Sequence, residues 1–342
     1  MLKKLTIMMV ASTIALSSAY AGKVIRIAHD AKPDAFDNVA HGFSATFKSI
    51  VESRSNGSIK VEIFPANQLG NSNERLAQTR EGLIQGTIAS TGSLATVYPP
   101  IDLLNLPFAF KTMSAAYDVY DGKFGKALTK DIDKSLKDIK VMGIVDTGGF
   151  FAITNSKRPI KTVADFKGIR IRTMTVPAHQ KLINSIGGEA YPLAWSELYS
   201  GLQTGVVDGQ MNPIPNIKFA RFDEVQKYMT LTNHLYAPIF FMMNNDFVSS
   251  LTKEEQAIIK DAVNQGIIVS RGLGRLNTLT ERGLASLAKN MEVNSLTPDA
   301  LKEFKTKAQA GVKQHFADSL DANGKSLLKI LEAEANKANS KY

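Results

Sequence analysis

The chain has 342 residues, of which 44% are hydrophobic and 21% are charged. This is the composition of a folded globular protein, and the length exceeds one ordinary hydrophobic core, which predicts two domains. The formal charge of +9 comes from dispersed lysines without interleaved aromatic residues, so we expect no nucleic-acid partner.

Residues 1–21 have the pattern of a cleaved signal peptide. Lys3 and Lys4 precede an apolar segment at residues 5–16, and Ala19-Tyr20-Ala21 is a small-x-small cleavage site. The apolar segment is too short for a stable transmembrane helix. The absence of cysteine excludes disulfides and a lipid-anchored mature N-terminus. We expect cleavage after Ala21, which lowers the formal charge to +7, and export to the periplasm.

Strands and helices alternate in the first third of the chain. Alternating apolar residues predict three strands, at residues 23–29, 59–63 and 87–90. An apolar stripe with helical spacing predicts a helix at 39–51, and the capping pair Asn71 and Glu74 opens another that reaches about residue 85. This succession predicts an α/β fold with a parallel sheet covered by helices on both faces.

Further along, the pattern predicts that the chain passes twice between two lobes. Strands at 141–145 and 150–154 follow each other so closely that a crossing is indicated near residues 146–149, and the apolar run 236–243 can carry the chain back. The capping box Thr252 and Glu255 begins a long helix towards residue 290. Thr297-Pro298 begins another.

Such crossings give two lobes that share a hinge and enclose a cleft, which suits the capture of a small molecule. The prediction assigns residues 22–148 and 238–277 to lobe I, and residues 149–237 and 278–320 to lobe II. Residues 321–342 are expected to form a C-terminal helix that packs across both lobes.

Motifs of enzymes and cofactor sites are missing from the sequence. It has no G-x-S-x-G elbow, P-loop or G-x-G-x-x-G after a strand, and no cysteine nucleophile. Its histidines show no metal-binding spacing. They are His29, His41, His179, His234 and His315. We therefore expect no enzymatic activity, no metal and no cofactor.

The run from Lys167 to Thr173 places two arginines in a predicted strand. Period-2 alternation puts Arg170 and Arg172 on one face and the intervening isoleucine on the other. Arg172 closes the run, where open α/β sheets bind ligands, and its guanidinium offers a rigid donor fork for a carboxylate. Arg170 is predicted to be an ion-pair or surface residue.

Two further residues allow two interpretations each. With Ser196 as N-cap of the next helix, Trp195 is either a hydrophobic staple or a ring that lines the cleft. Asn212 before Pro213 has the pattern of a helix N-cap following a turn at Asp208-Gly209, and its amide could also face a ligand. The local pattern favours capping for Asn212.

Several segments, in this order and spacing, resemble the extracytoplasmic solute-binding proteins of TRAP transporters, the DctP family, over essentially the whole mature chain. The segments are Phe64-Pro65 with Gln68-Leu69-Gly70, Leu106-Pro107-Phe108, Asp165 to Arg172, Ser196-Glu197-Leu198-Tyr199, and Val207-Asp208-Gly209-Gln210 with Asn212-Pro213. The resemblance implies a two-lobed periplasmic binding protein fold of type II, with two α/β domains joined by crossing strands and a long hinge helix.

The same resemblance implies site residues and a partner. The arginine that closes the G-x-x-x-R strand, Arg172, would clamp a ligand carboxylate, Asn212 would contact the ligand and Trp195 would form an aromatic wall. The turns at His29-Asp30 and Ser90-Thr91 would also face the ligand, as would Phe151 on the strand after the first crossing. The partner would be a membrane permease driven by an ion gradient, and the binding protein is expected to be a monomer.

Two departures from the family pattern bear on the ligand. The strand Gly149-Phe150-Phe151-Ala152 lacks the second arginine of family members that bind sugar acids, and Met211 replaces the usual glutamate. Both changes favour a less polar organic acid or one with a single carboxylate, with Asp30 able to pair with an amino or hydroxyl group. The alternatives are a binding protein of an ATP-driven importer or chemosensory receptor, and an exported enzyme acting on a carboxylate.

Overall fold

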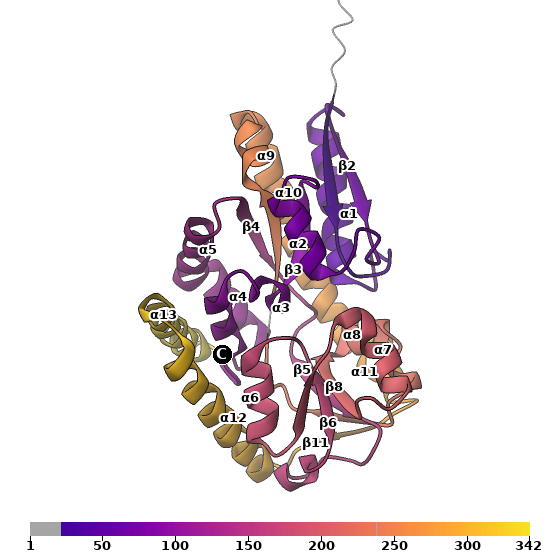
Figure 1. Ribbon diagram of the computed structural model, residues 1–342. Coiled ribbons are helices and arrows are strands. Elements are labelled where there is room, and N and C mark those ends of the chain that lie inside the picture. Colours follow the sequence, from indigo (N-terminus) through magenta and orange to yellow (C-terminus); the bar gives the residue numbers. More distant parts are fainter. Residues whose placement is uncertain (1–21, 237) are drawn as a thin grey trace, which may run out of the picture.

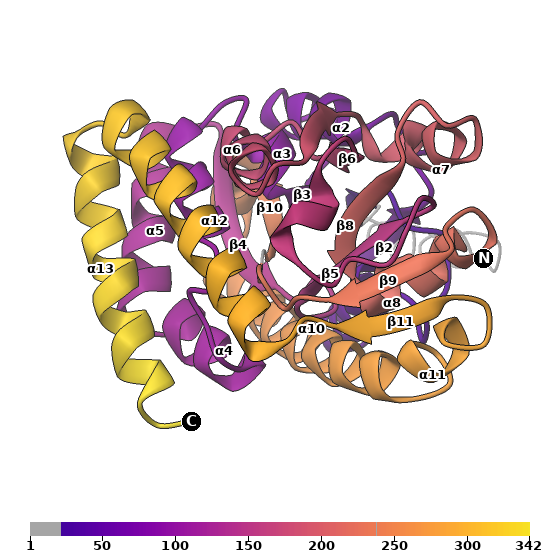
Figure 2. The ribbon, with the colours of Figure 1, turned by 90° about the horizontal axis from the view of Figure 1, so that it is seen from below.

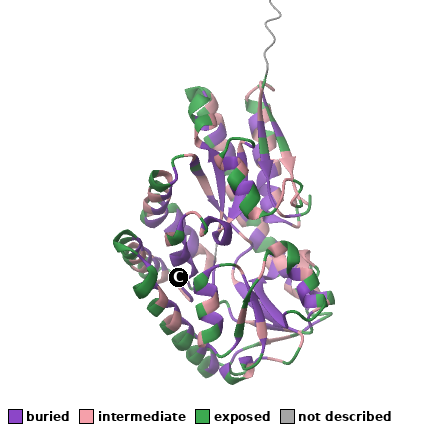
Figure 3. Ribbon diagram, viewed as in Figure 1, coloured by how far each residue is buried: buried purple, intermediate pink, exposed green. Residues whose placement is uncertain are grey.

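The computed structural model describes residues 22–236 and 238–342, so the predicted signal peptide lies outside the described residues. Two β-sheets, each flanked by helices, lie one above the other in Figure 1. The central strands are mostly buried, whereas two edge strands and the outer faces of the surrounding helices are exposed (Figure 3).

The first sheet has five strands in the order β2-β1-β3-β10-β4. Their bounds are Ile59–Phe64, Lys23–Ala28, Gly86–Ser90, Ile239–Asn244 and Ile139–Val145. β1 pairs in parallel with β2 and β3, as the alternation of strands and helices predicts. β10 is antiparallel to both β3 and β4, so the sheet is mixed.

The second sheet has six strands in the order β11-β9-β5-β8-β6-β7. Their bounds are Glu292–Ser295, Tyr228–Leu231, Phe151–Asn155, Gly209–Pro213, Arg170–Thr173 and Glu189–Pro192. β6 is parallel to both of its neighbours, β7 and β8, while β5 is antiparallel to β8 and β9.

Helices connect the strands and cover both sheets. The longer ones are α1 (Val39–Arg54), α2 (Ser72–Arg80), α4 (Met113–Asp121), α5 (Lys123–Ser135), α6 (Pro177–Ser185), α7 (Trp195–Gln203), α10 (Lys253–Leu279), α12 (Pro298–Ser319) and α13 (Ala322–Asn339). The short ones are α3 (Thr91–Leu94), α8 (Ile214–Phe219), α9 (Asn245–Ser250) and α11 (Leu284–Leu287), with 3-10 turns η1 (Pro99–Asn105), η2 (Val163–Phe166) and η3 (Phe222–Glu224).

Three of the predicted helix starts are confirmed by their caps. Asn71 and Glu74 form a capping box at α2, Thr252 and Glu255 form one at α10, and Thr297 caps α12. Two helices end earlier than predicted: α2 stops at Arg80, before a glycine with positive φ, and α10 stops at Leu279.

The two predicted crossings join the sheets. The chain passes from β4 to β5 through residues 146–149 and returns between β9 and β10. Asp146, almost fully buried, accepts hydrogen bonds from the backbone N–H groups of Gly148 (2.7 Å) and Gly149 (3.0 Å) and from the Tyr117 hydroxyl. Both glycines have positive φ, so this tight turn depends on them.

The C-terminal helices run along one side of the molecule (Figure 2). α12 packs on α6 and η2, and α13 packs on α4, α5 and η1. The division of the chain into lobes at the predicted residues stays a prediction. Among residues 22–236 and 238–342, no helix has the length and apolar character that a membrane crossing requires.

Candidate ligand-binding site

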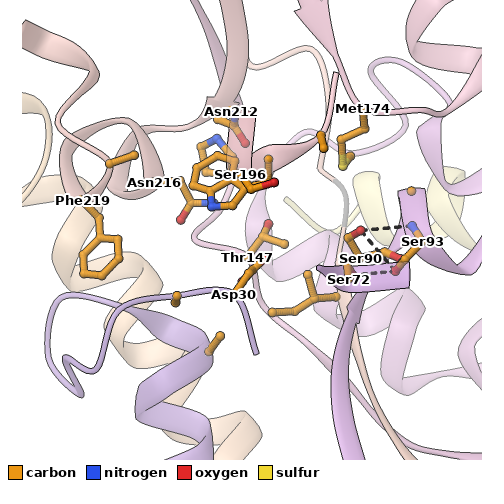
Figure 4. A pocket seen from close by; sticks show the side chains of 18 of the residues that line it. Asp30, Ser72, Ser90, Ser93, Thr147, Met174, Ser196, Asn212, Asn216 and Phe219 are labelled. Atoms are coloured by element: carbon orange, nitrogen blue, oxygen red, sulfur yellow. Dashed lines mark hydrogen bonds between the residues drawn. The ribbon is translucent and has the colours of Figure 1, made fainter. Parts of the chain in front are cut away.

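A cavity of about 710 Å³ lies between the two sheets, and both halves of the chain line it. Seven of the eight predicted site residues lie in its wall. They are Asp30, Ser90, Thr91, Phe151, Arg172, Trp195 and Asn212. Figure 4 shows side chains that follow β1 and β3 facing others that come from β8 and the helices beside it. The carboxyl ends of β1, β3, β6 and β8 thus meet at one place, as expected for a ligand site of open α/β sheets.

Arg172 is a buried cation in the cavity wall. It lies near the end of β6, is 3% exposed, and donates from Nε to the carbonyl oxygen of Leu193 at 2.9 Å. Burial lowers the pKa of its guanidinium to about 10, which leaves it charged at neutral pH, and no neighbouring charge offsets this cost. Within the described part of the chain, no carboxylate forms an ion pair with it. A buried charge without a counterion is costly, so this site favours an anionic ligand.

Arg170, two residues earlier, has the partner that Arg172 lacks. Its Nε lies 2.9 Å from Oδ2 of Asp208 and its Nη2 lies 2.7 Å from Oδ1. Lys157 approaches the same carboxylate at 3.2 Å. Burial opposes the ionisation of Asp208, but the hydrogen bonds from Arg170 and Lys157 outweigh it and hold the pKa at about 2. The prediction that Arg170 is an ion-pair residue is confirmed.

The predicted turn and cap at Asp208–Pro213 are wrong. Residues Gly209–Pro213 form β8, held between β5 and β6, and Pro213 rather than Asn212 is the N-cap of α8. Gly209 is needed for close strand packing, because a Cβ there would lie 2.2 Å from the carbonyl oxygen of Thr154. Asn212 caps nothing; it is 8% exposed, lines the cavity and donates from Nδ2 to Gln210 Oε1 at 2.5 Å.

Trp195 stands at the start of α7, whose N-cap is Ala194 and not the predicted Ser196. Glu197 accepts a hydrogen bond from the backbone N–H of Ala194 at 3.3 Å, which completes this helix end. The Trp195 ring is half-buried, lines the cavity and packs edge-on against Phe222 with ring centroids 5.7 Å apart. It therefore belongs to the apolar core beneath α7 and to the cavity wall together.

The opposite wall is polar. Asp30 lies beyond the end of β1, Ser90 caps α3 by accepting from the backbone N–H of Ser93 at 3.2 Å, and Ser72 donates to the Ser93 hydroxyl at 2.9 Å. Behind this wall, the fully buried Arg75 donates from Nη1 to the carbonyl oxygen of Gly70 at 2.7 Å. Sequence analysis missed Ser72 and Ser93, although each lies in the first turn of a helix that opens at the end of the β-strands.

His29 is the one predicted site residue that the structure does not bring to the cavity. It is fully buried, and its Nε2 lies 3.0 Å from Nδ1 of His41. Burial, and then the nearby charges of His41 and Arg75, lower its pKa to about 3, so the ring is neutral at physiological pH. In the described residues, no group of three histidine or carboxylate side chains could hold a metal ion.

Comparison with known proteins decides the family. The sequence matches DctP, the bacterial extracellular solute-binding proteins of family 7, over residues 31–319. The chain belongs to this family. This confirms the resemblance found in the sequence, and with it the expectation of a transport protein rather than an enzyme.

Three relatives illustrate the similarity of this family member. It is 30% identical over 251 residues to the 2,3-diketo-L-gulonate-binding periplasmic protein of Escherichia coli, covering 73% of this chain and 75% of the relative. The crystal structure of the sugar acid binding protein of Advenella mimigardefordensis with galactonate has a TM-score of 0.85 at 28% identity, covering 92% of this chain and 98% of the other.

A TRAP periplasmic solute-binding protein from Ochrobactrum anthropi has a TM-score of 0.82 at 30% identity, covering 94% of this chain and 98% of the other. These matches confirm the two-lobed α/β fold. They include proteins of TRAP transporters, the class that the sequence motifs indicated.

Proposed function

We propose that this protein captures a small organic acid with a single carboxylate in the cavity between its lobes. Arg172 binds the carboxylate, and Trp195 and Phe151 contact the apolar part of the ligand. The protein is exported to the periplasm and its signal peptide is cleaved after Ala21. It then delivers the ligand to a TRAP permease. It acts as a monomer.

The observation that carries this proposal is that Arg172 is a buried cation without a counterion in the described part of the chain. It is 3% exposed, faces the cavity, and has no carboxylate partner among the described residues. A ligand carboxylate would supply the missing partner with a charge-assisted hydrogen-bonded pair. When the lobes close, water leaves the pair and the attraction strengthens because the local dielectric falls.

The expected ligand carries one carboxylate, as the ligands named for two relatives do, on a less polar body. The relatives from Advenella mimigardefordensis and Escherichia coli bind galactonate and 2,3-diketo-L-gulonate by name. In this chain, Phe151 begins the strand after the first crossing, so that strand supplies no second arginine, and Met211 rather than a glutamate lies next to Asn212. Two further cations of the cavity wall, Lys32 and Arg221, are exposed to solvent. One carboxylate, together with an apolar or weakly polar body, suits this composition.

Lobe movement is expected at the two crossings. The predicted lobes, residues 22–148 with 238–277 and residues 149–237 with 278–320, meet at the turn of Gly148 and Gly149 and along α10. The Thr278 hydroxyl on α10 lies 3.3 Å from the carbonyl oxygen of Gly148, so the helix is in contact with the turn. A few residues that change φ and ψ are sufficient for hinge closure.

A thermal-shift screen of the mature protein against organic acids tests the proposal. The set should contain keto acids, hydroxy acids, dicarboxylates, sugar acids and zwitterions. An acid present at ~100 times its dissociation constant adds about 2.7 kcal/mol of stability, which raises the melting temperature by several degrees.

Arg172→Ala should abolish that shift, because loss of the guanidinium leaves the ligand carboxylate unpaired at a cost of about 2–5 kcal/mol. Arg170→Ala is the matched control, since it removes an arginine of the same strand that already has a protein partner. No shift with any acid, or an unchanged shift in Arg172→Ala, would contradict the proposal.

A further inference from the structure

A chain of buried polar side chains runs behind the cavity wall and ends at Asn212. Gln226, in the loop before β9, donates from Nε2 to the backbone carbonyl oxygens of Val225 (2.9 Å) and Asp208 (3.3 Å). Thr154 on β5 donates to Gln226 Oε1 at 2.9 Å. Gln210 on β8 donates from Nε2 to the Thr154 oxygen at 2.9 Å, and Asn212 donates from Nδ2 to Gln210 Oε1.

Water has almost no access to this relay of Gln226, Thr154, Gln210 and Asn212. The first three side chains are 2%, 0% and 0% exposed, and Asn212 alone reaches the cavity. Buried polar groups must find partners within the protein, because an unmet hydrogen bond costs the full desolvation of the group. Each amide is therefore held to one orientation by its neighbour.

The direction of the relay follows from its first link. Backbone carbonyl oxygens only accept, so Gln226 must turn its NH₂ group towards them and its Oε1 towards Thr154. The single hydroxyl hydrogen of Thr154 is then committed to Gln226, and its oxygen can only accept from Gln210. Gln210 therefore directs Oε1 towards Asn212, and Asn212 must donate to it from Nδ2.

Asn212 thereby keeps two groups that the relay does not use, the acceptor Oδ1 and the second hydrogen of Nδ2. Within the described residues, no donor bonds to this oxygen. Sheet register puts Arg172 beside Gln210, with Asn212 one pleat further along β8 and on the same face. The backbone positions that carry the donor fork and the acceptor are thus offset by about 6–7 Å along the strand direction.

We infer that the relay fixes the orientation of the Asn212 amide and leaves Oδ1 as an unused acceptor, so that the site favours acids that carry a hydroxyl or ammonium group close to the carboxylate. This inference rests on the proposed function and names the ligand class more closely. Asp30, on the opposite wall, adds a second acceptor. An oxo group or a second carboxylate at the same position has no hydrogen to donate to Oδ1 and should bind less tightly.

Titration calorimetry with matched acids tests the selectivity. The probes are 2-hydroxyisocaproate, leucine, 2-oxoisocaproate and 4-methylpentanoate, which share one carbon skeleton and differ in the group beside the carboxylate. We expect the hydroxy or amino acid to bind roughly tenfold or more tightly than the oxo and unsubstituted acids. Equal affinities, or a preference for the oxo acid, would overturn the inference.

Thr154→Val tests whether Asn212 is positioned by the relay. Removing the hydroxyl frees the Gln210 amide, so the preference should fall by about tenfold while binding of the unsubstituted acid persists. Thr154→Ser should restore the preference. The control is Thr230→Val, which removes another fully buried hydroxyl of the same sheet, bonded to Asn294 and outside the relay, and should leave the preference intact.

A measurement without ligand separates this inference from the proposed function. In the ¹⁵N–¹H spectrum of the free protein, the side-chain amide protons of Asn212, assigned by their loss in Asn212→Asp, should exchange slowly with solvent. They should exchange much faster in Thr154→Val and unchanged in Thr230→Val. Fast exchange in the wild type would overturn the relay, even if acids bind through Arg172. Slow exchange with no acid bound would contradict the proposed function alone.

Discussion

Each end of the β6–β8 strand pair carries an arginine, but only one of the two arginines forms an ion pair within the described part of the protein. At the outer end, Arg170 meets the carboxylate of Asp208 through two hydrogen bonds of 2.7 and 2.9 Å. At the cavity end, Arg172 has a carbonyl oxygen as its partner and Asn212 has an unused acceptor. An arginine whose carboxylate is supplied by the protein stabilises the fold, whereas one left without a carboxylate stabilises a complex.

The largest effect should come from replacing each arginine by methionine, which keeps the length of the side chain and removes the charge. Arg172→Met should weaken acid binding by about 2–5 kcal/mol. It should also raise the unfolding free energy of the ligand-free protein by about 1 kcal/mol, because an unpaired buried charge is removed. Calorimetry and urea unfolding measure the two quantities.

Arg170→Met is the opposite case, since it should lower stability and leave acid binding intact. If both variants lose stability to the same extent, the contrast between the two ends is wrong. If Arg170→Met loses acid binding while remaining folded, the outer ion pair takes part in binding and the comparison needs revision.

A smaller effect on stability is expected from replacing Asp208, the carboxylate partner of Arg170. Asp208→Asn should cost about 1–2 kcal/mol of unfolding free energy at pH 7, a value reduced by the partial exposure of its partners. The pKa of Asp208 is about 2 in the folded protein and near 4 when unfolded. Its contribution is therefore complete above pH 4 and lost as the pH falls through about 2.

Unfolding curves between pH 2 and pH 7 check this dependence. The difference in stability between wild type and Asp208→Asn should shrink as the pH approaches 2. A difference that stays constant over this range would show that the Asp208 charge contributes nothing.

The polar wall gives the next effect in size. Asp30→Asn should weaken binding of the hydroxy or amino acid by about tenfold, since one charged acceptor is lost, and change binding of the unsubstituted acid little. Calorimetry with the two acids measures the difference. Equal losses for both acids would show that Asp30 does not bind the hydroxyl or ammonium group.

The smallest effect concerns Trp195, the one tryptophan of the chain. Because its ring lines the cavity, acid binding should change the intrinsic fluorescence. Trp195→Phe should abolish the signal and weaken binding only a few-fold, since an aromatic ring remains. If calorimetry detects binding but the fluorescence does not change, the Trp195 ring does not contact the ligand.

Local signals in the sequence predicted much of this molecule. The capping boxes at α2 and α10 involve residues three apart, and the alternation that separated Arg170 and Arg172 from the isoleucines spans a few residues. The first crossing was recognisable because two strands follow one another without room for a helix, and the return was recognisable from the apolar run 236–243. In each case the residues that form the signal and the structure they determine lie within a few residues of each other in the sequence.

The wrong predictions concern residues whose positions depend on contacts far away in the sequence. Asp208-Gly209 and Asn212-Pro213 have the composition of a turn and a cap, but Gly209 is required by the Thr154 carbonyl of a strand more than fifty residues earlier. His29 and Asp30 are neighbours in sequence, yet only Asp30 reaches the cavity. The relay joins Thr154 to Gln226 and Gln210, and nothing in the sequence near Thr154 indicates its partners.

The position of β10 sets an order in which this protein can mature. This strand, residues Ile239–Asn244, lies between β3 and β4 in the first sheet, so the sheet has a gap until that segment is present. A chain that emerges from a membrane pore with its N-terminus first would hold β3 and β4 with open edges while the whole second sheet up to β9 passes through. Open strand edges invite association with other chains. If the chain is exported as we propose, its early half therefore has to be kept from other chains until residue 244 has arrived.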